Sequence, residues 1–261
     1  MSAAVRGCIT RDVAYSPQPG ARLDVYAPAG ADGEAPVVVF AHCGWLSGGQ
    51  RRRLFRYIGA GLASRGFVAV IPDGGLDADA GHERALGNLA AAAAWARVNA
   101  AGYGGDPSRV FLMGHASGAY LVAMLCLEAR WLGAHGVQLG DLRGAVGISG
   151  LYEVLSLNEG RATAVFGPRA RWAAAEPVFH AHPLAPPMLL VAGQRDEVDP
   201  ETTSRLACAL RTVGGQVAEI RYPKLCDRGG LRRLTGPTRF HAIVLREVER
   251  FVRLHSLGPG A

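Results

Sequence analysis

The chain has 261 residues, 49% of them hydrophobic and 19% charged, a balance that excludes a disordered or fibrous protein and suits a globular core. Its five cysteines show no C-x-x-C spacing, which argues against a disulfide framework or a zinc site and leads us to expect a cytoplasmic protein. The formal charge of +6 comes from scattered arginines without interleaved aromatic residues, and no apolar run reaches bilayer length, so we expect neither nucleic-acid nor membrane partners.

Short apolar runs alternate with helical patterns along the chain. Buried strands are predicted at 36–41, 67–71, 110–113, 144–148, 187–192 and 217–222. Helices are predicted at 54–64, 85–100, from the 110–113 strand to about 129, at 201–213 and at 242–254. This alternation predicts an α/β fold, with a mostly parallel sheet and helices on both faces. Without repeats or a linker, we expect one domain over residues 1–261, in which residues 151–178 could form at most a small lid.

The most informative segment is Gly114 to Gly118, which reads Gly-His-Ala-Ser-Gly. It lies between an apolar strand and a small-residue helix start, as the nucleophile elbow G-x-S-x-G requires. The residue at the apex, where a nucleophilic serine stands, is Ala116. A methyl group cannot attack a carbonyl carbon, so the pattern predicts the elbow without its nucleophile.

Four further segments occur in the order of a known family. They read L-D-V-Y-A-P at 23–28, Y-G-G-D-P-S-R-V at 103–110, S-G-L-Y-E at 149–153 and P-P-M-L-L-V-A-G-Q-R-D at 186–196. With the elbow, they resemble the α/β-hydrolases grouped with small carboxylesterases, feruloyl-esterase-like proteins and kynurenine formamidases (arylformamidases). The resemblance covers nearly the whole chain and implies an α/β-hydrolase fold.

The resemblance also implies a Ser-His-Asp triad that needs no cofactor and no metal. Asp196 matches the acid, although Asp199 is close enough to compete. The family reads approximately Y-P-G-L-G-H where this chain reads Y-P-K-L-C-D at 222–227, so Asp227 occupies the position of the base. If Asp196 and Asp227 face each other, one of them should bind a proton more readily. His241, many residues later, is an alternative base only if a loop brings it back.

The mechanism that the resemblance implies also needs two backbone N–H groups as oxyanion donors. Ser117 follows the apex, and one helical step of about 100° turns its side chain away from the site, so we interpret it as a donor of its backbone N–H. A relocated nucleophile at Ser117 stays an alternative. The oxyanion loop His42, Cys43, Gly44 and Trp45 is one residue shorter than the family's H-G-G-x-W and replaces a glycine by cysteine. Cysteine resists backbone angles that glycine adopts, so we expect a distorted oxyanion hole.

These substitutions predict a pseudo-hydrolase that binds a small-molecule ligand or a protein partner. The alternative is an active ester or amide hydrolase with a relocated nucleophile such as Ser117, or a non-hydrolytic catalyst with Asp196 and Asp227 as acid and base. A structural subunit is a third possibility, and the sequence does not predict an oligomeric state.

Overall fold

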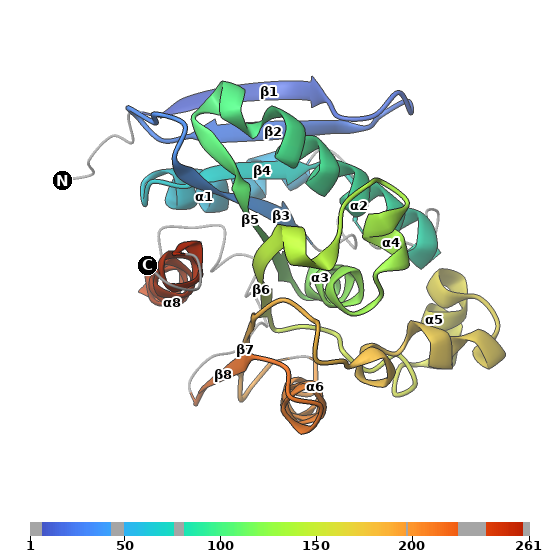
Figure 1. Cartoon of the computed structure of the whole chain (residues 1–261). Helices are drawn as coiled ribbons and strands as arrows, with labels where there is room; N and C mark the ends of the chain where they lie inside the picture. Colours follow the sequence, from blue (N-terminus) through green and yellow to red (C-terminus); the bar gives the residue numbers. More distant parts are fainter. Residues whose placement is uncertain (1–6, 43–49, 76–80, 197, 224–238, 258–261) are drawn as a thin grey trace.

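The protein was analysed as a computed structural model that describes residues 7–42, 50–75, 81–196, 198–223 and 239–257 (Figure 1). Within these ranges eight strands form one sheet in the order β1-β2-β4-β3-β5-β6-β7-β8, which runs from the top to the lower left of Figure 1. The strands β1 and β2 are antiparallel to their neighbours, and β3 to β8 are parallel. The bounds are β1 Cys8–Ala14, β2 Arg22–Ala27, β3 Ala35–Ala41, β4 Val68–Pro72, β5 Gly105–His115, β6 Leu142–Ile148, β7 Met188–Gly193 and β8 Val217–Tyr222.

Helices cover both faces of the sheet, as the α/β pattern predicts. One face packs against α1 (Gln50–Ala63) and α8 (Arg239–Ser256), and the other against α2 (Gly81–Asn99), α3 (Ser117–Leu127) and α6 (Glu201–Thr212). Two shorter α-helices are α4 (Arg130–Gly133) and α5 (Glu159–Phe166). Short 3₁₀ helices occur at Ala100–Tyr103, Leu139–Asp141, Arg169–Ala175 and Pro177–His180. No helix in the described ranges is long and apolar enough to cross a bilayer.

Side chains alternate between the two faces of the central strands, so each parallel strand contributes to two cores. In β5, Val110 and Leu112 join the core under α2 and α3, whereas Phe111 and Met113 join the core under α1 and α8. A strand that is buried on both faces has no polar positions, which is why these runs are continuously apolar.

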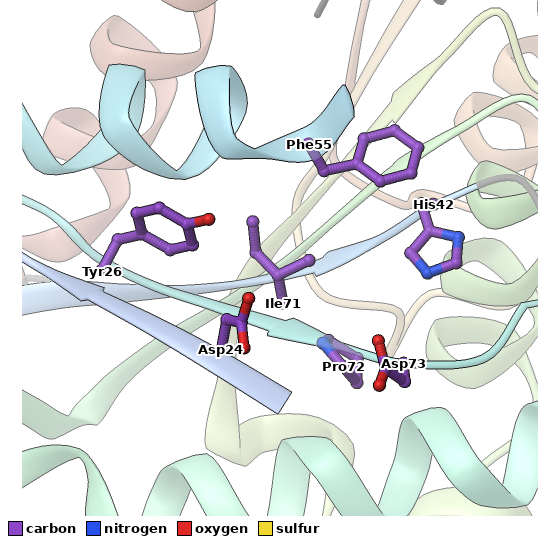
Figure 2. Close-up of a pocket in the computed structure, with 7 residues that line it drawn as sticks. All are labelled: Asp24, Tyr26, His42, Phe55, Ile71, Pro72 and Asp73. Carbon is purple, nitrogen blue, oxygen red and sulfur yellow. The ribbon is translucent and has the colours of Figure 1, made fainter. Parts of the chain in front are cut away.

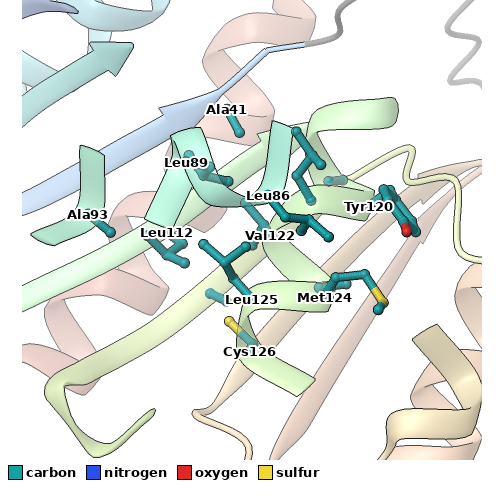
Figure 3. Close-up of a cluster of buried hydrophobic side chains, with 14 of the residues drawn as sticks. Ala41, Leu86, Leu89, Ala93, Leu112, Tyr120, Val122, Met124, Leu125 and Cys126 are labelled. Carbon is teal, nitrogen blue, oxygen red and sulfur yellow. The ribbon is translucent and has the colours of Figure 1, made fainter. Parts of the chain in front are cut away.

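Helix α3 lies at the centre of the larger core, and every one of its residues is buried. In Figure 3 its side chains, among them Val122 and Leu125, lie against Leu86 and Leu89 of α2 and Leu112 of β5. A helix that is apolar on all sides is stable only inside a protein. This helix therefore fixes the position of the turn that precedes it.

The structure corrects the expected elements at several places. Strands β1 and β2 precede the first predicted strand; the residues of β1 are mostly exposed, and β2 contains most of the L-D-V-Y-A-P motif. The helix expected to reach about residue 129 ends at Leu127, because Glu128 is extended with φ −129° and ψ 92°. The closing helix begins at Arg239 rather than at 242, so the backbone of His241 is helical.

Candidate active site

The turn between β5 and α3 has the geometry of a nucleophile elbow. Ala116 stands between them with φ 52° and ψ −118°, a backbone conformation that residues with a side chain rarely adopt. A Cβ atom on Gly114 would lie closer than 3.0 Å to the carbonyl oxygen of Gly118, and a Cβ on Gly118 equally close to that of Ala41. Positions 114 and 118 therefore accommodate only glycine, because the backbones of the strands and the helix approach each other too closely for a Cβ atom.

Hydrogen bonds hold the backbone of Ala116 on both sides. Its N–H donates to the carbonyl of Ile148, at the end of β6, at 2.9 Å. Its carbonyl accepts from the N–H groups of Ala119 at 3.0 Å, Tyr120 at 3.3 Å and Leu151 at 3.4 Å. Between Val110 and Leu127, Ala116 alone is not buried. The apex of the elbow is therefore a partly exposed alanine, whose methyl group is not a nucleophile.

Ser117 is the first residue of α3 and only 2% exposed. It is as buried as the residues that follow it in the helix, in contrast to the partly exposed Ala116 beside it. This burial supports the interpretation that Ser117 is a packing residue, and its role as an oxyanion donor stays a prediction.

Asp196 lies three residues after the end of β7 and is partly buried. Its Oδ2 accepts a hydrogen bond from the N–H of Gly193 at 2.6 Å, and its own N–H donates to the Gly193 carbonyl at 3.3 Å. Because β6 alone separates β5 from β7, Asp196 and Ala116 follow strands that are about 10 Å apart at the usual strand spacing. Both therefore lie at the carboxyl edge of the sheet, where open α/β folds bind ligands.

Asp199, the alternative candidate for the triad acid, forms hydrogen bonds with residues of α6. Its Oδ1 accepts from the N–H of Glu201 at 3.0 Å, and its Oδ2 accepts from Arg205 at 3.2 Å. Arg205 also forms an ion pair with Glu153, after β6. These contacts give Asp199 a structural function and favour Asp196 as the acid.

His42, the first residue of the expected oxyanion loop, is 1% exposed, and its ring stacks on Phe55 with centroids 4.8 Å apart. Both rings line a cavity of about 10 Å³ together with Asp24 and Asp73, which reach it from β2 and from the end of β4 (Figure 2). A cavity of this size holds about one water molecule. Burial, together with the charge of Asp73, raises the pKa of the neighbouring Tyr15 to about 12. The cavity is a polar packing site rather than a substrate pocket.

Comparisons with known proteins agree with this geometry. The BD-FAE family model matches residues 23–140. The isoprenylcysteine alpha-carbonyl methylesterase ICME of Arabidopsis thaliana is 28% identical over 250 residues, which cover 82% of this chain and 55% of the relative. Esterase LipQ of Mycobacterium tuberculosis (strain ATCC 25618 / H37Rv) is 27% identical over 238 residues, with 83% and 55% coverage. These matches support a carboxylesterase-like α/β-hydrolase family for this chain. It spans about half the length of these two curated relatives.

Solved structures support the fold of this esterase-like α/β-hydrolase. The apo form of Thermogutta terrifontis esterase 2 superposes with a TM-score of 0.76 at 22% identity, covering 98% of each chain. A truncated carbohydrate esterase from gut microbiota gives a TM-score of 0.80 at 18% identity, covering 95% of this chain and 96% of the other. The resemblance to carboxylesterases expected from the motifs is therefore confirmed at the level of the family and the fold.

Several expected site residues lie outside the described ranges. These are Asp227, proposed at the base position, and Cys43, Gly44 and Trp45 of the oxyanion loop. The side chain of His241 is also outside them. The facing pair of Asp196 and Asp227 thus stays a prediction. Within the part of the chain that the structure describes, no three His, Cys, Asp or Glu side chains form a group that could hold a metal ion.

Two buried ionisable residues, His115 and Glu176, were not singled out as sites from sequence. His115, directly before Ala116, is 4% exposed, and burial lowers its pKa to about 4, so it is neutral at pH 7. Glu176 is 3% exposed, and its Oε2 accepts from the N–H groups of Val154 and Leu155 at 2.8 and 2.9 Å. Burial raises the pKa of Glu176, and the two N–H donors oppose that rise. Glu176 thereby connects the end of segment 151–178 to its beginning by hydrogen bonds. No local sequence pattern predicts this contact.

Proposed function

We propose that this esterase-like α/β-hydrolase is a pseudo-hydrolase that binds a small carboxylic ester or a related acyl compound without cleaving it. The observation that carries the proposal is Ala116, a partly exposed residue in the strained elbow conformation. A serine there would offer a hydroxyl to a bound carbonyl carbon, whereas the methyl group offers only a contact surface.

The proposed ligand class rests on the elbow and on the relatives. The elbow lies at the carboxyl edge of the sheet, where open α/β folds bind their ligands, and this position supports a ligand beside Ala116. The named relatives are a methylesterase and an esterase, which favours an ester over an amide, although an N-formyl aryl amide is also to be tested. We infer further that the chain is one cytoplasmic domain in which residues 151–178 act as a short lid.

Turnover assays test the loss of chemistry. We expect purified protein to hydrolyse p-nitrophenyl acetate, p-nitrophenyl butyrate and N-formylkynurenine no faster than background, because loss of one triad member costs about 10⁶-fold in turnover. A rate well above background that disappears in Ser117→Ala would instead establish the active hydrolase with a relocated nucleophile. A rate that survives in Ser117→Ala would equally contradict the pseudo-hydrolase and point to another group.

Binding assays test the remaining half of the proposal. Calorimetric titration with p-nitrophenyl butyrate should show saturable binding to the wild-type protein, and Ala116→Leu should abolish it by filling the elbow surface. The matched control is Ala134→Leu, at an exposed position after α4, which should bind as wild type does. Equal binding by both variants, with circular dichroism showing both folded, would refute a ligand site at the elbow.

A further inference from the structure

The last helix of the chain, α8, carries exposed apolar side chains that its packing does not use. Figure 1 shows α8 nearly end-on, at the left of the sheet. Its inner side is fixed in the core by five buried side chains: Val244, Leu245, Val248, Phe251 and Val252. On its outer side Ile243 is 38% and Leu254 65% exposed, and Leu257, directly after the helix, is 64% exposed. A surface helix normally has polar residues on that side, so these three side chains need another explanation.

Three arginines share the outer side of α8 with these apolar residues. At about 100° per residue, six side chains fall within a sector of about 100° around the helix axis. We call them the outer stripe: Ile243, Arg246, Arg250, Arg253, Leu254 and Leu257. All three arginines are exposed. The two acids of the helix, Glu247 and Glu249, are partly buried and lie outside this sector.

Acidic side chains neutralise only part of the charge of the outer stripe. Glu249 is shared between two arginines, because it accepts from Arg253 at 3.0 Å and pairs with Arg65, which precedes β4, at 3.4 Å. Arg246 and Arg250 form no ion pair with any residue that the structure describes. The stripe therefore combines an excess of positive charge with exposed aliphatic side chains.

We propose that the outer stripe of α8 docks this chain on the surface of an anionic phospholipid bilayer. The guanidinium groups donate to lipid phosphates, while the two leucines and the isoleucine enter the boundary between headgroups and acyl chains. Long arginine stems reach past apolar neighbours to the phosphates, so one side of a helix matches both layers of this boundary. No membrane partner was expected from the sequence, because its arginines are scattered; α8 brings three of them to one side.

Two other occupants of the outer stripe explain fewer of its residues. A second copy of the chain would bring the three arginines of each stripe into one interface, where like charges repel. A nucleic acid would pair with the arginines, but aliphatic side chains cannot stack on bases as the aromatic residues of such sites do. An anionic bilayer uses the charge and the apolar side chains together, and it is attracted by the same surface that it then contacts.

The far end of the stripe lies away from the elbow. Arg253, Ser256 and Leu257, at the end of α8, line an open cavity of about 460 Å³ together with Ala35, which begins β3. The stripe thus ends at the amino edge of the parallel strands, whereas Ala116 follows the carboxyl end of β5. Membrane docking and ligand binding at the elbow can therefore be measured independently of each other.

Flotation with lipid vesicles tests the contribution of charge. Wild-type protein should float with vesicles of phosphatidylcholine and phosphatidylglycerol but not with phosphatidylcholine alone, and added salt should release it. Arg246→Glu with Arg250→Glu should weaken binding by roughly tenfold or more, because two attractive charges become repulsive. The matched control is Arg84→Glu at an exposed position of α2, which should bind as the wild-type protein does.

A second pair of variants tests the apolar contact. Leu254→Ser with Leu257→Ser should weaken binding to the anionic vesicles without changing the net charge, because it removes two side chains from the lipid boundary. Val98→Ser, at a 79% exposed position of α2, is the matched control and should have no effect. In the wild-type protein, anionic vesicles should slow amide hydrogen exchange in the last turn of α8 and leave that of α2 unchanged.

Wild-type protein that does not bind anionic vesicles, or binds them equally after the arginine reversals, would overturn the proposal. Binding that survives both serine changes would overturn it as well, because charge alone would then hold the protein. Duplex DNA bound more tightly than the vesicles, and lost only with the arginines, would assign the stripe to nucleic acid. A dimer in sedimentation velocity that the serine changes dissolve would assign it to a second copy.

Discussion

Replacing Ala116 by glycine tests whether the elbow still stores backbone strain. A non-glycine residue with φ 52° and ψ −118° costs about 1–3 kcal/mol, which glycine avoids because it has no Cβ. Glycine also increases the entropy of the unfolded chain, which offsets about 0.4–1 kcal/mol of that gain. Ala116 is partly exposed, so the loss of its methyl group removes little packing. We expect Ala116→Gly to raise the free energy of unfolding by about 0–2 kcal/mol, measured by urea denaturation.

The matched control is Ala123→Gly in the interior of α3, where the alanine is fully buried and helical. Glycine there costs about 1 kcal/mol in helix propensity, and the lost contacts of the methyl group add to it. The two alanine-to-glycine changes should therefore shift stability in opposite directions, or the elbow change should be close to neutral. If Ala116→Gly destabilises the protein as much as Ala123→Gly does, the reasoning about strain is wrong.

Three further changes address the buried ionisable groups and the missing triad. Because burial lowers the pKa of His115 from 6.5 to about 4, the unfolded chain binds more protons between these values, and stability should fall by up to roughly 3 kcal/mol as the pH drops from 6.5 through 4. His115→Leu should flatten this dependence in urea titrations at several pH values; an unchanged slope would contradict it. Glu176→Ala should lower the free energy of unfolding by about 1–3 kcal/mol or more, because the N–H groups of Val154 and Leu155 lose their acceptor. Glu176→Gln should lower it less, because the amide retains one oxygen that can accept. Burial raises the pKa of Glu176, so the folded protein holds that proton more tightly than the unfolded chain does. The free energy of unfolding of the wild-type protein should therefore decline as the pH rises through the raised pKa, and that of Glu176→Gln should not. The same pH dependence in both proteins would rule this out. Ala116→Ser alone should restore little esterase turnover, and Ala116→Ser with Asp227→His should restore more; full activity from the single change would mean that His241 or another histidine already acts as the base.

The sheet and most of its helices could be predicted because parallel strands buried on both faces are continuous apolar runs. Strand β1 could not, because its edge position leaves most of its side chains exposed and polar residues interrupt its apolar ones. The early start of α2 at Gly81 was missed for a related reason, since the polar run His82-Glu83-Arg84 hides the helical pattern that begins at residue 85. Periodicity reports burial, which explains why β1 was missed, but β2 is buried apart from Arg22 and was identified only as part of the L-D-V-Y-A-P motif.

The residues of the candidate site also differ in whether the sequence predicts them. The elbow and the location of Asp196 follow from local patterns, because a sharp turn needs particular residues at fixed spacing. His42 and Glu176 contact partners that are distant in sequence, Phe55 and Val154, so the residues next to them in the sequence do not predict these contacts. The choice between Asp196 and Asp199 likewise became visible only through the contacts of Asp199 with α6.

The close approach at Gly114 and Gly118 has a consequence for how this chain tolerates mutation. The atoms that a new Cβ would meet at these positions are backbone carbonyl groups, which no rotamer change can move. Apex residue 116, in contrast, is partly exposed, and its hydrogen bonds are made by backbone groups that a substitution leaves in place. A selection that reports only the abundance of folded protein would therefore find two intolerant positions around a permissive one. In this chain, the glycines of the elbow are required by folding alone, and they would persist whether or not any chemistry is retained at the apex.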